Sequence, residues 1–200
     1  MGRPAKFKRH TALAVARDAI WRNGFRASTV KSLSEDLGIT RSSFYNAFGS
    51  REELFFELLP DYAANSPDAV LFSAVERPVL PLITDFFQKL CRARAEDPEA
   101  KGCMVINAIC ELVPSRDGLG ADLPPLALKT FDRLGELLRL AQTNQEITPD
   151  TDTRELALAT FNLIIGLNVS CKVVRSEADL WSIARSTLSG LGILHERTDA

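Results

Sequence analysis

The sequence has few of the residues that build metal sites. Its 200 residues include two histidines and four cysteines, and no two cysteines form a CxxC pair. A structural zinc site needs about four Cys or His ligands held close together. We therefore expect no metal and no cofactor, and we interpret the thiols as free core residues in a reducing compartment. The cysteines are Cys91, Cys103, Cys110 and Cys171.

Long hydrophobic runs are also missing. A transmembrane helix needs about 18 consecutive apolar residues, and no run in the chain reaches that length. The chain opens with GRPAKFKRH, which lacks the apolar core of a signal peptide. We expect a cytoplasmic protein with no membrane partner.

Catalytic patterns are absent as well. The sequence offers no set of histidine, carboxylate and nucleophile, and no glycine-rich phosphate loop, so we do not expect an enzyme. The net charge is only −2, but the charges are unevenly distributed. Residues 1–55 hold ten Lys/Arg against five Asp/Glu, whereas the remainder holds 14 against 21. A basic N-terminal part on an acidic body indicates that one end of the protein meets phosphate.

The most informative segment covers residues 26–59. Val30, Leu33 and Leu37 are spaced i, i+3, i+7, which predicts the apolar face of a short helix. Gly38 follows at the position where a residue in the left-handed conformation commonly ends a helix. Glycine adopts that conformation at the lowest energetic cost. Thr40 then stands where its hydroxyl can cap a second helix.

The second helix of this segment has two different faces. Phe44 and Phe48 lie at i, i+4 and point inward. The outward positions are Arg41, Ser42, Ser43, Tyr45 and Asn46. Two short helices joined by a glycine turn, the second presenting small polar groups, are typical of a helix-turn-helix that enters the major groove.

Several motifs follow one another in this part of the chain. They are Trp21-Arg22-Asn23-Gly24-Phe25, Ser28-Thr29-Val30, Leu37-Gly38-Ile39-Thr40, Ser43-Phe44-Tyr45 and Phe48-Gly49-Ser50-Arg51-Glu52-Glu53-Leu54. In this order and spacing, the stretch Gly2–Leu59 resembles the N-terminal DNA-binding domain of TetR/AcrR-type repressors. Farther along, Gly102–Asn107 resembles a helix start found in one branch of that family.

The remaining periodicity predicts an all-α fold. The helices expected outside the helix-turn-helix cover about 8–23, 50–62, 79–96, 103–113, 124–145, 153–174 and 177–194. Ser50 and Glu53 predict a capping box at the start of the 50–62 helix, and residues 116–120 are expected to form a loop. We assign residues 1–49 to a three-helix DNA-binding domain and 50–200 to a helical domain for ligand binding and dimerisation.

Roles on double-stranded DNA follow from side-chain chemistry. Arginine prefers guanine and asparagine prefers adenine in the major groove. We expect base contacts from Arg41, Ser43 and Asn46. Phosphate contacts are expected from Thr29, Thr40, Ser42, Tyr45 and Arg51, the assignment of Tyr45 depending mainly on the resemblance. Arg3 and Lys6 form a basic arm that can enter the minor groove.

The segment 153–174 is apolar on almost all sides, which favours burial on most sides. The resemblance implies a homodimer whose recognition helices lie about 34–36 Å apart. The last two helices would then pair across the two-fold axis as a four-helix bundle. The interface residues we expect are Phe161, Ile165, Asn168, Ile183, Leu188 and Leu191. The alternative is that these helices are the internal core of a monomer.

The resemblance also implies an unknown small-molecule effector bound in the C-terminal domain. Candidate pocket residues are Phe86, Met104, Asn107, Phe131, Phe161 and Trp181. Each can equally be an ordinary core or interface residue. Cys103 and Cys110, seven residues apart on one expected helical face, are either thiol sensors or inert core residues, and inert core residues are favoured.

These observations lead to one expected function and three alternatives. We expect a homodimeric repressor that a small-molecule effector releases from a palindromic operator. The alternatives are an activator without a ligand, an architectural DNA-binding protein, and a carrier or enzyme that uses the C-terminal cavity.

Overall fold

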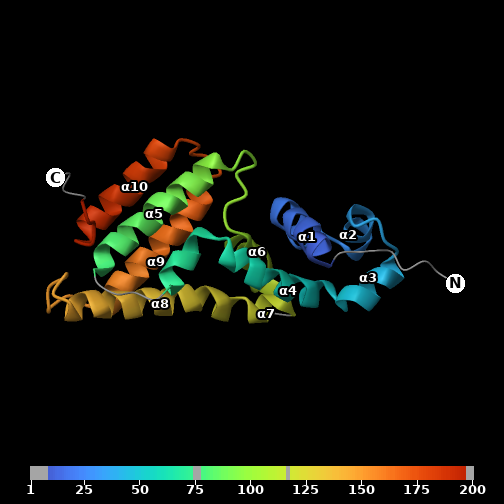
Figure 1. The fold of residues 1–200 in the computed structure, drawn as a ribbon, viewed down its shortest axis with the longest axis horizontal. Coiled ribbons are helices and arrows are strands. Elements are labelled where there is room, and N and C mark those ends of the chain that lie inside the picture. Colours follow the sequence, from blue (N-terminus) through green and yellow to red (C-terminus); the bar gives the residue numbers. More distant parts are fainter. Residues whose placement is uncertain (1–8, 74–77, 116–117, 197–200) are drawn as a thin grey trace. The chain divides into compact units, whose positions relative to one another are not determined.

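The computed structural model describes residues 9–73, 78–115 and 118–196, and within these ranges the protein consists of helices and turns (Figure 1). This confirms the all-α prediction. In chain order the elements are α1 (Arg9–Asn23), α2 (Val30–Asp36), α3 (Arg41–Phe48), α4 (Arg51–Ala64), η1 (Pro67–Phe72), α5 (Val79–Glu96), α6 (Met104–Leu112), η2 (Val113–Ser115), α7 (Leu119–Asp122), α8 (Pro124–Thr143), α9 (Thr153–Ser170) and α10 (Glu177–Gly190).

The chain divides into two compact units. Unit 1 takes Met1–Asn65 and Asn107–Leu123, and unit 2 takes Ser66–Ile106 and Pro124–Ala200. Our boundary after residue 49 assigned α4 to the second domain, but α4 groups with α1–α3. The reason is aromatic packing: Phe55 stacks edge-on against Phe25 with ring centroids 5.7 Å apart, and Tyr62 against Trp21 at 5.2 Å.

Unit 1 has a small core fixed by charged contacts at its edge. Phe44 and Phe48 are buried with ring centroids 5.3 Å apart, as their spacing predicts. Arg9 of α1 donates to both carboxylate oxygens of Glu57 on α4, at 2.6 and 2.7 Å, and to the Ala47 carbonyl at 2.8 Å. One arginine therefore ties α1 to both α3 and α4.

Unit 2 is a helical bundle in which α10 packs against α5 and α9, and α8 packs against α9 and α5 (Figure 1). Its core contains Phe86, Phe87, Leu134, Leu163 and Leu180. We expected α9 to be buried on most sides. Within the chain it is not, because Leu158 and Val169 are exposed while the opposite face is buried.

Several local expectations were wrong at their edges. α4 continues through Pro60 to Ala64, although proline removes one helical N–H donor, because Tyr62 beyond it is buried. α7 (Leu119–Asp122) begins inside the segment 116–120 that we expected to form a loop. α9 ends at Ser170 and α10 at Gly190, each about a turn before its predicted end.

The cysteines differ in environment. Cys91, Cys103 and Cys171 are buried, whereas Cys110 is exposed, so the prediction of four core thiols fails for Cys110. Burial raises the pKa of the Cys91 thiol to about 12. Cys103 precedes the first residue of α6, so it does not share a helical face with Cys110.

Among the helices within the described residues, none is long and apolar enough to span a membrane. No group of three or more His, Cys, Asp or Glu residues in the same ranges could hold a metal ion.

Candidate nucleic-acid interface

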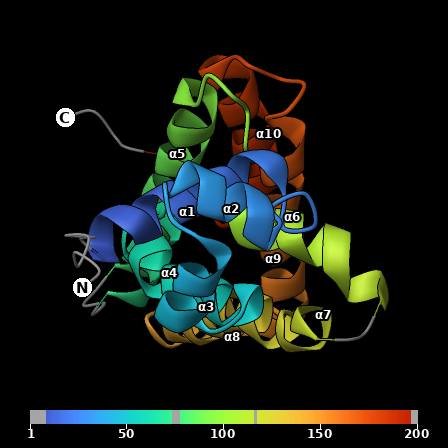
Figure 2. The same ribbon diagram turned by 90° about the vertical axis from the view of Figure 1, so that its right-hand side faces the viewer.

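The interface begins with the helix pair α2 and α3, which Figure 2 presents facing the viewer. Thr29 is the N-cap of α2, and its Oγ1 accepts a hydrogen bond from the Ser32 N–H at 3.1 Å. After α2, Gly38 has φ +64° and the Ile39 N–H donates to the Ser34 carbonyl at 2.9 Å. This confirms the predicted glycine turn and fixes where α3 starts.

α3 presents the polar face that its sequence predicts. Thr40 caps α3, since its Oγ1 accepts from the Ser43 N–H at 3.1 Å and lies 2.9 Å from the Ser43 Oγ. Tyr45 is 54% exposed, so its ring belongs to this face and not to the core. The exposed residues of α3 are Arg41, Ser42, Ser43, Tyr45 and Asn46.

Three arginines of unit 1 differ in what they contact. Arg9 is engaged by Glu57, and Arg17 contacts Asp61 at 2.6 Å, so both hold helices together. Arg41 is exposed and makes no hydrogen bond or ion pair within the described parts of the chain. Arg41 is therefore the arginine of α3 that is available to a ligand.

Arg51 has a structural role that the sequence did not indicate. Its Nη1 donates to the carbonyls of Phe25 and Ser28, each at 3.1 Å, and its guanidinium lies 4.6 Å from the centre of the Phe25 ring. The turn between α1 and α2 thereby engages the residue that we expected to contact phosphate. A long-range contact of this kind has no signal in residue spacing.

A second residue that sequence analysis missed holds the same turn. The Glu111 carboxylate of α6 accepts from the Phe25 N–H at 2.9 Å and from the Arg26 N–H at 2.7 Å. No local motif marks Glu111, because its partners lie about 85 residues earlier in the chain.

The structure brings most of the predicted DNA-binding residues together. Thr29 and Thr40 are exposed at the starts of α2 and α3, next to the exposed face of α3. Arg3 and Lys6 of the predicted arm lie outside the described residues.

The predicted pocket residues do not form one site. Phe86 and Met104 are buried in packing, and Phe131 and Phe161 contact each other with centroids 6.1 Å apart. Trp181 lines a surface groove with Gln88, Arg92, Glu177 and Ala178. Asn107 belongs to unit 1, whereas the other five residues belong to unit 2.

The predicted interface residues also separate. Ile183 is 40% exposed, and Phe161, Ile165 and Leu191 are half-buried. Asn168 and Leu188 are buried inside unit 2, so placing them at a contact with a second chain was wrong. The Asn168 Oδ1 accepts from the Arg94 Nε at 2.6 Å, so its partner lies within its own unit.

An exposed polar face on the second helix of a helix-turn-helix, in a chain whose other unit is a helical bundle, defines the class of helix-turn-helix transcriptional regulators. Two family models agree. Residues 12–58 match "Bacterial regulatory proteins, tetR family", and residues 79–187 match "Tetracyclin repressor-like, C-terminal domain". The chain belongs to the TetR family of DNA-binding transcriptional regulators.

Individual relatives support this assignment. The transcriptional repressor ComR of Escherichia coli K12 is 28% identical over 190 residues, covering 94% of this chain and 90% of ComR. The repressor BdcR of the same organism is 30% identical over 111 residues, covering 54% of this chain and 55% of BdcR. Among solved structures, the TetR-family regulator CifR in complex with 26-base-pair operator DNA superposes with a TM-score of 0.83 and 26% identity, covering 94% of this chain and 98% of CifR.

Proposed function

We propose that this chain is a homodimeric repressor that binds a palindromic operator and that a small-molecule effector in the helical domain releases it. The repressor would act in the cytoplasm, where the operator DNA lies. The observation that carries this proposal is the exposed polar face of α3, set by two helix caps and a buried aromatic pair. Support also comes from CifR, a similar protein whose structure includes operator DNA.

The chemistry of that face assigns a role to each residue. The Arg41 guanidinium suits guanine N7 and O6, and the Asn46 amide suits adenine N6 and N7. The Ser43 hydroxyl, shared with Thr40, can reach a base edge at the start of α3. Thr29, Thr40, Ser42 and Tyr45 would fix register on phosphates, and Arg51 would support them from the turn that it holds.

Dimerisation is supported by an exposed face of α9. Leu158, Asn162, Gly166 and Val169 follow one another at spacings of three or four residues and are all exposed. Ile183 adds an exposed apolar side chain on α10. A surface of this composition suits pairing with the same surface of a second copy.

Effector binding is supported by polar groups within the unit 2 bundle. Arg94, Thr160 and Asn168 are buried there among apolar side chains. The Asn168 amide nitrogen donates to the Ile164 carbonyl at 2.9 Å. An effector that entered the bundle would exchange these internal hydrogen bonds for contacts of its own, and such contacts distinguish one small molecule from another.

DNA binding is tested with fluorescent duplexes tiled across the region upstream of the gene. We expect one palindromic duplex to bind at least about 1000-fold more tightly than a shuffled duplex, with an affinity that falls steeply as salt rises. R41A should weaken the palindrome by about 1–3 kcal/mol and the shuffled duplex far less. R139A removes the same charge from an exposed position on α8 and should leave that specificity unchanged.

The alternatives predict other outcomes in the same assay. An architectural protein would bind all duplexes about equally, and a carrier or enzyme would bind none at low salt. A ligandless activator would bind the palindrome but would not be released by any member of a metabolite library.

A further inference from the structure

The turn between α1 and α2 is held by a carboxylate from a distant helix. Glu111 lies in the last turn of α6 and is half-buried. Its Oε2 accepts from the Phe25 N–H at 2.9 Å, and its Oε1 accepts from the Arg26 N–H at 2.7 Å. Both oxygens are used, so the contact fixes the orientation of the turn as well as its position.

The turn fits closely around this carboxylate. Gly24 has φ +84°, and a Cβ added there would lie 3.0 Å from the Glu111 Oε2. Arg51 engages the carbonyl groups of the same turn: its Nη1 donates hydrogen bonds to the Phe25 and Ser28 carbonyl oxygens. Thr29, the next residue, is the N-cap of α2. The position of the turn therefore sets the start of the helix-turn-helix.

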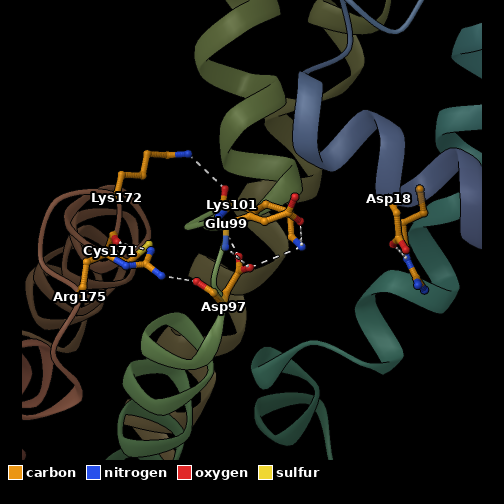
Figure 3. A network of polar contacts seen from close by, with 8 residues as sticks. Asp18, Asp97, Glu99, Lys101, Cys171, Lys172 and Arg175 are labelled. Atoms are coloured by element: carbon orange, nitrogen blue, oxygen red, sulfur yellow. Dashed lines mark hydrogen bonds and ion pairs between the residues drawn. The ribbon is translucent and has the colours of Figure 1, made fainter. Parts of the chain in front are cut away.

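The segment that leads into α6 is tied to the segment that follows α9. Lys172, just after α9, donates to the Lys101 carbonyl at 3.1 Å, and Arg175 donates to the Asp97 carbonyl (Figure 3). Asp97 in turn accepts from the Lys101 N–H at 2.7 Å. Gly102 has φ +70°, and a Cβ there would lie 2.5 Å from the Asn168 carbonyl oxygen. The approach to α6 is thus packed on the C-terminal end of α9.

α6 joins these two anchor points through one continuous helix. The division between the units falls between Ile106 and Asn107, so α6 begins in unit 2 and ends in unit 1. We propose that Glu111 is a positioning residue through which α6 sets the α1–α2 turn, so that operator affinity depends on how α9 holds the start of α6. This inference rests on the proposed operator binding and names the residue that regulates it.

The first test compares E111Q with D122N. Each removes one negative charge from unit 1, and Asp122 is exposed at the end of α7. We expect E111Q to weaken operator binding at least about tenfold and to leave binding of a shuffled duplex within about twofold, because the phosphate contacts remain. D122N should leave the ratio of the two affinities unchanged.

Hydrogen exchange distinguishes positioning from general destabilisation. In the wild type the Phe25 and Arg26 amides should be protected, and in E111Q they should exchange at least about tenfold faster while amides in α5 remain unchanged. E111D keeps the charge but shortens the side chain, and its operator affinity should fall between those of the wild type and E111Q. E111D also provides the comparison if E111Q does not fold.

The outcomes separate the two proposals. If the wild type binds no operator, the proposed function is lost. If the wild type binds specifically and the Glu111 variants bind with the same specificity, the present inference is overturned and the proposed function stands. A loss in E111Q that is equal for operator and shuffled duplex overturns the inference as well.

The dependence on α9 is tested by a double-mutant cycle. K172A removes the contact to the Lys101 carbonyl, and we expect it to change operator affinity at least about threefold. In the E111Q background the same substitution should have less than half that effect on a logarithmic scale, because the link to the turn is already lost. Additive effects, or no effect of K172A in either background, would contradict transmission through α6.

Discussion

At the residue scale, unit 2 contains side-chain polar atoms that are shielded from solvent and have no hydrogen-bond partner within the described residues. The Oδ1 of Asp68 in η1 is shielded from solvent and has no hydrogen-bond partner among the described residues. Burial raises the pKa of this carboxyl, and the nearby Arg94 opposes that shift. Shielding a carboxylate oxygen that has no hydrogen-bond partner costs folding free energy, and the raised pKa indicates that Arg94 does not fully offset this cost, so Asp68 is expected to destabilise the domain once it ionises.

The pH dependence of this penalty has a definite sign. Below the ordinary Asp pKa of about 3.9, the carboxyl is protonated in both the folded and the unfolded chain, and there is no penalty. As the pH rises through the higher folded pKa, the unfolded chain releases its proton first and the folded state loses stability. D68N should therefore be more stable than the wild type at pH 7 by about 1 kcal/mol, and the gain should shrink toward pH 4.

Urea unfolding between pH 4 and pH 7 measures this difference. D132N changes an exposed aspartate on α8 and should show no such trend over the same range. A gain in D68N that does not vary with pH would show that ionisation of Asp68 is not its cause.

At the element scale, the N-terminal caps of α3 and α4 were features that local sequence could predict, whereas several C-terminal helix ends were not. The capping box at α4 is present: the Ser50 Oγ accepts from the Glu53 N–H and the Glu53 Oε2 accepts from the Ser50 N–H, both at 3.0 Å. Each partner is three residues from the other, so the pattern is complete within the segment itself. The same holds for the Thr40 cap, which we predicted correctly, and the Thr29 cap is equally local because its partner, Ser32, is three residues away.

Contacts made by distant residues could not be predicted in this way. The start of α5 is capped by the Glu146 carboxylate, which accepts from the Val79 and Leu80 N–H groups at 2.8–2.9 Å. Pro78, the local N-cap residue, has no side chain that can do this. Glu111 and Arg51 serve the α1–α2 turn in the same long-range manner. Spacing in the sequence reports which face is apolar, but not which remote carboxylate will reach a backbone N–H.

The capping box gives a prediction about stability. S50A removes the acceptor for the Glu53 N–H and should lower the free energy of unfolding by about 1 kcal/mol. For a chain of this size, the corresponding fall in Tm is about 2–4 °C. S42A, at an exposed position inside α3, should cause no such fall because alanine is the better helix former. Thermal unfolding by circular dichroism decides the matter, and equal stability of S50A and the wild type would contradict it.

At the scale of the whole molecule, charge and apolar surface are separated along the chain. The basic residues that remain exposed in unit 1 suit a polyanion, whereas the exposed apolar residues of α9 suit a second copy of the chain. The sequence predicted that α9 and α10 form the dimer interface, which stays a prediction, and it did not show which face of each helix packs inside unit 2. Asn168 and Leu188 illustrate this, because one-dimensional periodicity cannot divide apolar residues between an internal and an external interface.

A charge placed on the outer face of α9 tests the dimer. Leu158 on α9 is 44% exposed and Leu128 on α8 is 49% exposed, so L158E and L128E introduce the same change at similarly accessible sites. If α9 pairs across a two-fold axis, L158E leaves an unpaired charge in the interface at a cost of about 3 kcal/mol, which raises the dimer Kd at least about 100-fold. Sedimentation velocity should then show a monomer for L158E and a dimer for the wild type and L128E. Operator affinity should fall when dimerisation is lost, because a monomer contacts only one half-site. A monomeric wild type, or an L158E variant that remains dimeric, would remove α9 from the interface.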